Sequence, residues 1–230
     1  MTSEDREQSA GVEEELRLML SQPLERVVTA DRRAPLTGVA QEWDIPKSDR
    51  TALDTWGLPQ LQLFTPRPQA GAGPTLVPNL AGEHERRLVK DGQRLYDLGF
   101  WGAEKDGNVV GVVPGDGRVL HLLPAPITID SIPEALRPCY PGLHKPAVSF
   151  LSSSVTQYIE TAWRWDAAIQ MLRRIEEPPD IAPEEAHVRH HERLHACVEL
   201  VVDAVRRVDR AVKAEEPQSV WIELIRGNSI

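Results

Sequence analysis

Three short apolar runs between residues 95 and 123 place the strongest constraint on the fold of this chain. They cover Leu95 to Trp101, Val109 to Val113 and Val119 to Leu123, and each has the length of a strand. The runs are separated by Asp106-Gly107-Asn108 and Gly115-Asp116-Gly117. Both triplets contain residues that readily adopt the positive φ of tight hairpins. The three runs therefore predict an antiparallel meander.

Helical patterns lie on both sides of the meander along the chain. A short helix is expected to begin near Ser48 and to end at Gly57, because a glycine followed by a proline two residues later is a typical helix stop. After a further strand at 147–151, the serines at 152–154 offer capping oxygens for a helix that reaches about residue 174. These elements predict the α+β class, with a mainly antiparallel sheet flanked by helices and a C-terminal helical extension.

Charge and proline content divide the chain into segments. The first fifteen residues hold six acidic side chains and one arginine, a composition typical of disorder. A stretch with three prolines precedes a long C-terminal segment, in which the apolar residues recur at helical spacing. The expected organisation is a disordered acidic tail at 1–12, an N-terminal helical segment at 13–44, an α+β domain at 45–175, a proline-rich linker at 176–183 and C-terminal helices at 184–230.

The overall charge narrows the kinds of partner. Lys and Arg total 26 against 35 Asp and Glu, a net charge of −9, so no basic surface that could follow a phosphate backbone is expected. Direct binding of nucleic acid is therefore not expected. No stretch approaches the roughly 18 apolar residues of a membrane helix, and the N-terminus is acidic where a secretory signal is basic. We expect a cytoplasmic protein with no membrane partner.

One sequence motif suggests metal chemistry. His191-Glu192-Arg193-Leu194-His195 matches the H-E-x-x-H pattern, in which two histidines on one helix face bind zinc and the glutamate activates a water. No downstream acidic residue stands out as a third ligand, and Arg189 and Arg193 add charge beside the motif. A zinc-dependent hydrolase that uses 191–195 stays open as an alternative. The preferred interpretation has no catalytic residue, metal or cofactor.

Several short motifs follow one another in an order found in a known family. They are Trp56-Gly57-Leu58-Pro59, Leu98-Gly99, Asp116-Gly117-Arg118-Val119 and Phe150-Leu151-Ser152-Ser153-Ser154, followed by Tyr158-Ile159. This order resembles the SUKH-4 branch of the SUKH superfamily over roughly residues 50–175. Leu151 stands where the usual pattern has an Asn. The resemblance implies a non-enzymatic protein-binding module, chiefly an immunity protein that neutralises a toxin by direct binding.

The partner surface is expected to be acidic. A regulatory or scaffold adaptor that binds a host or phage protein is the second alternative to a toxin-binding protein. In either case we expect partner binding at a surface that includes the hairpin tips around Glu104, Asp106 and Asp116, because loop tips carry function on a rigid framework. Such a surface would steer a basic protein and raise its association rate.

Overall fold

A five-stranded antiparallel sheet forms the centre of the computed structural model, which describes residues 3–34, 40–60, 64–67, 73–102, 108–213 and 219–227. The strands follow the order β3-β4-β5-β6-β9. The predicted meander corresponds to β4-β5-β6, and the prediction of an α+β fold with an antiparallel sheet and C-terminal helices is confirmed. The strand bounds are β3 (Phe64–Pro66), β4 (Tyr96–Trp101), β5 (Val109–Val112), β6 (Val119–Leu122) and β9 (Val148–Ser152).

Helices surround this sheet. Helix α1 begins at Ser3, so the backbone is helical through much of the 1–12 stretch for which acidic composition predicted disorder. In the described part of the chain, no helix is both long and apolar enough to cross a membrane. The helix bounds are α1 (Ser3–Ser21), α2 (Leu24–Val27), α3 (Lys47–Trp56), α4 (Glu83–Leu88), α5 (Val155–Leu172), α6 (Glu184–Val208) and α7 (Val220–Gly227).

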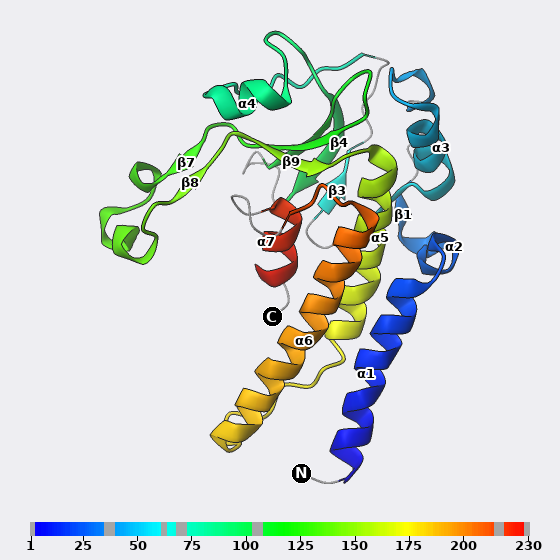
Figure 1. Ribbon diagram of the computed structural model, residues 1–230, viewed down its shortest axis with the longest axis vertical. Helices are drawn as coiled ribbons and strands as arrows, with labels where there is room; N and C mark the ends of the chain where they lie inside the picture. The colour runs from blue at the N-terminus through cyan, green and yellow to red at the C-terminus, as the bar shows by residue number, and fades with distance from the viewer. Residues whose placement is uncertain are drawn as a thin grey trace.

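Short elements complete the fold. Strand β1 (Arg33–Ala34) pairs with β2 (Leu58–Pro59), and β7 (Ile127–Thr128) pairs with β8 (His144–Lys145). The second pair, together with the 3-10 turns between its strands, projects away from the sheet (Figure 1). We call residues 127–145 the arm. The 3-10 turns η4 (Ile129–Ser131) and η5 (Glu134–Cys139) belong to the arm, whereas η1 (Ala30–Arg32) and η2 (Ala40–Glu42) lie near the N-terminal helices.

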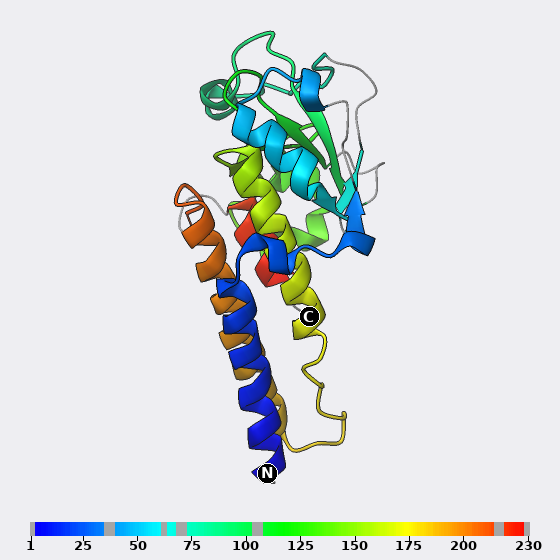
Figure 2. The same cartoon turned by 90° about the vertical axis from the view of Figure 1, so that its right-hand side faces the viewer.

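The sheet buries apolar side chains on both faces. Val110 and Val112 belong to the large cluster that includes α5, α6 and α7, whereas Leu120 and Leu122 belong to a smaller cluster beside α4. This division follows from the two-residue period of a strand. Helices α1, α5 and α6 lie side by side and extend past the sheet (Figures 1 and 2).

Helix α5 is buried on nearly all sides because other helices surround it. Trp163 and Trp165 are two residues apart and cannot share one helix face, yet neither exposes any surface. The Trp163 indole donates to the carbonyl oxygen of Gly57 at 3.3 Å. Arg164 is 8% exposed and donates to the carbonyls of Leu20 and Gln22. A guanidinium at the C-terminal end of α1 also suits the helix dipole.

Two buried carboxylates bind the N-terminus of α5. Asp49 accepts from the backbone N–H of Thr156 at 2.9 Å and from its hydroxyl at 2.6 Å. Asp209 accepts from the backbone N–H and the hydroxyl of Ser153 at 2.6 and 2.8 Å. Ser154 caps the helix by accepting from the N–H of Gln157, as the serine run predicted. Helix α6 ends at Val208, and the next residue, Asp209, is the one that binds the donors of Ser153.

The turn between β5 and β6 packs directly against one of these carboxylates. Gly117 has a φ of +75°, and a Cβ there would lie 2.2 Å from Oδ2 of Asp49. Gly115, in the same turn, has a φ of +88°, but a Cβ there would meet nothing within 4 Å. A substitution at Gly115 therefore measures the cost of the positive φ alone, whereas one at Gly117 measures that cost plus a steric clash.

We expect Gly117→Ala to lower the free energy of unfolding by about 2 kcal/mol or more, because it adds a clash with Asp49 to the strain of a positive φ. Gly115→Ala, the matched control, should cost only about 1 kcal/mol, since it carries the strain alone. Urea denaturation monitored by tryptophan fluorescence measures both. Equal losses in the two variants would show that the contact with Asp49 does not contribute.

Candidate partner-binding groove

A groove of about 1040 Å³ lies between the arm, the sheet and helix α7. Its lining comes from three parts of the chain that are far apart in sequence. The sheet contributes Trp101, Asn108, His121 and Ser149, and α7 contributes Val220, Glu223, Leu224 and Gly227. The arm and the residues next to it contribute Ile127, Cys139, Tyr140, Pro141, Gly142, Leu143, His144, Lys145 and Pro146.

The arm forms the outer wall of the groove. Ile127 pairs with Lys145 and Thr128 pairs with His144, and the 3-10 turns η4 and η5 occupy the tip. Leu136 and Tyr140 are 48% and 52% exposed, which makes them two of the large hydrophobic side chains that the described surface leaves in water. An exposed apolar group beside a groove is a feature of protein interaction sites.

A β-bulge turns Trp101 toward the groove side of the sheet. Tyr96 and Trp101 are five residues apart and would point to opposite faces of a regular strand. In β4 the register with β5 shifts between Asp97 and Gly99, which leaves Leu98 without a Cα partner. Tyr96 and Trp101 consequently both join the large core cluster. A bulge of this kind re-aims the side chains that follow it.

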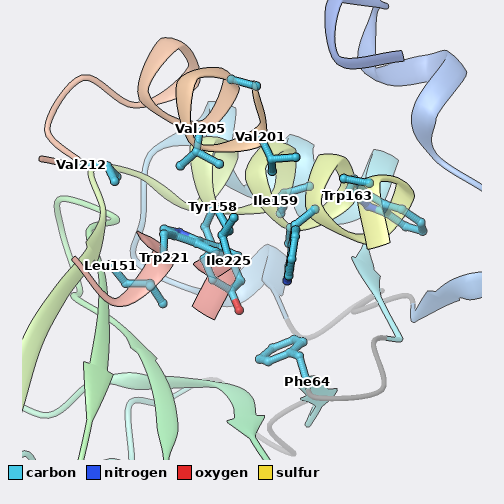
Figure 3. Packing of buried hydrophobic residues seen from close by; sticks show 14 of the residues in the cluster. Phe64, Leu151, Tyr158, Ile159, Trp163, Val201, Val205, Val212, Trp221 and Ile225 are labelled. Carbon is cyan, nitrogen blue, oxygen red and sulfur yellow. The ribbon is translucent and has the colours of Figure 1, made fainter. Parts of the chain in front are cut away.

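An aromatic cluster connects the groove to α5 and α7. The rings of Trp101 and Trp221 lie 5.6 Å apart and nearly perpendicular, and Trp221 is also 5.6 Å from Tyr158. Figure 3 shows Tyr158 and Trp221 side by side in the core, with Phe64 nearby. The Trp221 indole donates to Oγ of Ser152 at 3.3 Å. In contrast, Nε1 of Trp101 has no hydrogen-bond partner among the described residues, although Trp101 is only 4% exposed.

The charged groups of the groove neutralise one another. Nζ of Lys145 on β8 lies 2.8 Å from Oε2 of Glu223 on α7, so one ion pair joins the arm to the opposite wall. Burial, and secondarily the nearby Lys145 ammonium, lowers the pKa of His121 to about 4. The imidazole of His121 is therefore neutral at pH 7. No hydrogen bond within the part of the chain that the structure describes involves it.

The three acidic residues that the sequence singled out do not form one described surface. Asp116 lies in the β5–β6 turn, where it accepts from the backbone N–H and Nε of Arg118 at 2.9 and 2.8 Å. Glu104 and Asp106 lie outside the described residues. The described residues on either side of this loop are Gly102 and Asn108, and both line the groove. Asp116 follows the other end of β5, so the length of that strand separates Asp116 from Asn108.

The H-E-x-x-H residues lie on the outside of α6. His191, Glu192 and His195 are all exposed, and the rings of His190 and His191 lie 5.7 Å apart. In the ranges that the structure describes, no group of three or more His, Cys, Asp or Glu side chains is arranged to hold a metal ion. The geometry provides two adjacent histidines and no third protein ligand of the kind that catalytic zinc sites use.

We expect the free energy of unfolding to fall as the pH is lowered from 6.5 to about 4, in part because of His121. The unfolded chain takes up a proton on this imidazole near pH 6.5, whereas the folded chain does so only near pH 4, so protons favour the unfolded state in this interval. His121→Gln should flatten this part of the pH profile. His144→Gln, at an exposed imidazole of the same groove, is the control. Identical slopes for the wild type and His121→Gln would contradict the assignment.

The purified chain should contain no stoichiometric zinc, because His191 and His195 lack a third ligand in the described structure. Metal analysis after dialysis measures this directly. His191→Ala combined with Glu192→Gln should leave partner binding unchanged. One zinc per chain that resists a chelator, together with loss of activity in Glu192→Gln, would support the hydrolase alternative.

Comparison with protein-family models matches residues 19–226 to the SUKH-4 immunity protein family. Comparisons with curated proteins and with solved structures returned no significant match. The family match begins in the last turn of α1 and includes the whole sheet and nearly all of α7, so the similarity noted over residues 50–175 extends over nearly the whole chain. This chain belongs to the SUKH-4 immunity protein family.

Proposed function

We propose that this chain neutralises a toxin by direct, stoichiometric binding, and that the groove beneath the arm is the binding surface. Family membership supports a toxin-neutralising role, and immunity proteins of this family are generally non-enzymatic. The observation that carries the choice of surface is the groove itself, a concave site of about 1040 Å³ bounded by sheet, arm and α7. A concave and mostly apolar surface with a few polar groups is typical of binding sites.

The arm supports this assignment because the core does not depend on it. None of the residues 127–145 belongs to either of the two hydrophobic clusters of the described structure. The arm nevertheless leaves Leu136 half exposed, and likewise Tyr140, which lines the groove. Exposed apolar side chains on the wall of a groove favour contact with another molecule. Tyrosine in particular is enriched at the centre of protein interfaces.

The acidic loop between β4 and β5 has a supporting part in this proposal. Glu104 and Asp106 belong to the loop that begins and ends at the edge of the groove, next to Gly102 and Asn108. Carboxylates at the rim of an interface chiefly raise the association rate of a basic partner. Asp116 is at the far end of β5 and already pairs with Arg118 at 2.8 Å, so we assign it no part in binding at the groove.

Titration of the cognate toxin, to be identified by pull-down and from the neighbouring reading frames, tests the proposal. Toxin activity should fall linearly with added protein and reach its minimum at one chain per toxin, because binding has no turnover. Tyr140→Arg should raise the Kd at least roughly tenfold, since it places a charge on the apolar wall of the groove. Val77→Arg, at another exposed hydrophobic residue that does not line the groove, is the matched control.

Association rates measured with the same toxin distinguish the contributions of the acidic residues. Glu104→Lys with Asp106→Lys should lower the association rate at low salt, whereas Asp116→Lys should leave it unchanged. An unchanged Kd for Tyr140→Arg would locate the interface elsewhere. Inhibition by far less than one chain per toxin would contradict a binding mechanism.

A further inference from the structure

We propose that the groove recognises an extended, uncharged peptide segment of its partner, which inserts apolar side chains and offers a backbone carbonyl to the indole N–H of Trp101. The inference rests on the proposed function only for the identity of the partner. The chemistry of the occupant follows from three properties of the groove: its paired charges, its unpartnered polar groups and its apolar lining.

The charges of the groove favour an uncharged occupant. Lys145 and Glu223 are its basic and acidic side chains, respectively, among the described lining residues, and they already lie 2.8 Å from each other. An uncharged occupant leaves this ion pair intact, whereas a charged segment would compete with one of its members for the other. His121 is neutral at pH 7 and adds no charge. Charge complementarity therefore favours a segment without ionised side chains.

The unpartnered polar groups match a peptide backbone. Nε1 of Trp101 is a buried donor with no partner in the described structure, and such a group costs about 1–3 kcal/mol until an acceptor reaches it. The neutral imidazole of His121 has one nitrogen that donates and one that accepts. An extended segment presents both carbonyls and N–H groups along its length and carries no charge. It can therefore satisfy both residues at once.

The lining and the size fit a short segment with apolar side chains. Tyr140, Leu143, Val220 and Leu224 face the groove from the arm and from α7. The volume of about 1040 Å³ lies just above the range of small-ligand sites, about 300–1,000 Å³. A few residues of an extended chain fit this space, whereas a folded domain does not. A projecting loop or a terminus of the partner has this form.

Selection from a phage library of random linear peptides tests the inference without the toxin. The full chain is the target, and a Ser149→Arg variant, which places a guanidinium on the groove floor, is used for counter-selection. Peptides that discriminate between the two should share an uncharged core with aromatic or aliphatic residues. A synthetic copy of the strongest binder should lose affinity at least roughly tenfold for Ser149→Arg. Should that variant not fold, Tyr140→Arg, at an exposed position, replaces it.

The indole N–H resonances in a ¹⁵N NMR spectrum report the predicted hydrogen bond. The Trp101 resonance, identified by its loss in Trp101→Phe, should move downfield when the peptide binds. The Trp163 resonance is an internal control, because that indole already donates to Gly57. Binders with charged cores and strong salt dependence, binding without movement of the Trp101 resonance, or failure to select any discriminating peptide would each overturn the inference.

The two proposals can fail separately. A peptide that binds the groove and shifts Trp101, in a chain that does not inhibit the toxin, would uphold this inference and refute the proposed function. The opposite result is also possible: the chain inhibits the toxin at one to one, but its Trp101 resonance responds neither to the toxin nor to a selected peptide. That result would uphold the proposed function and refute this inference.

Discussion

The hydrogen bonds at the N-terminus of α5 hold together parts of the chain that are remote in sequence. Asp49 from α3 and Asp209 from the end of α6 each accept from a backbone N–H at the start of this helix or just before it. These N–H groups have no partner within the helix, and the helix dipole favours negative charge there. Hydrogen bonds to an ionised acceptor contribute about 1.5–3 kcal/mol each. Helices α3, α5 and α6 are thereby fixed relative to the sheet that leads into α5 through β9.

The geometry of the groove depends on this anchor. Tyr158 lies one turn into α5 and contacts Trp221 of α7, which in turn contacts Trp101 of β4. Trp221 also donates to Ser152, the last residue of β9. Trp101 and the α7 wall of the groove are therefore part of the same packed cluster as α5. A change at Asp49 or Asp209 is expected to reach the groove through these contacts.

Local sequence was sufficient to predict elements that are stabilised locally. The meander could be predicted because its apolar runs and glycine turns encode strands and hairpins within a few residues. The anchor could not, because Asp49 and Thr156 are brought together only by the folded chain. The arm was also missed, since β7 and β8 have two residues each and show no alternation of apolar and polar residues. Their pairing, and not their pattern, makes them strands.

The position of a binding surface also depends on contacts between segments that are remote in sequence. Acidic residues in turns predicted a charged surface, but a count of charges does not say which turns meet in space. The antiparallel arrangement puts Asp116 at one end of β5 and the described residues Gly102 and Asn108 at the other. The ion pair between Lys145 and Glu223 could not be read from the sequence either, because it joins the arm to the last described helix.

The two walls of the groove differ in how strongly the core constrains them. Trp221 and Ile225 hold α7 in the core with no exposed surface, so substitutions there alter stability as well as recognition. The arm contributes nothing to either hydrophobic cluster of the described structure and is joined to α7 through one half-exposed ion pair. Exposed pairs of this kind stabilise a fold by at most about 1 kcal/mol. Substitutions along the arm can therefore change which segment the groove accepts at little cost in folding free energy, while Trp101 and α7 keep the opposite wall unchanged.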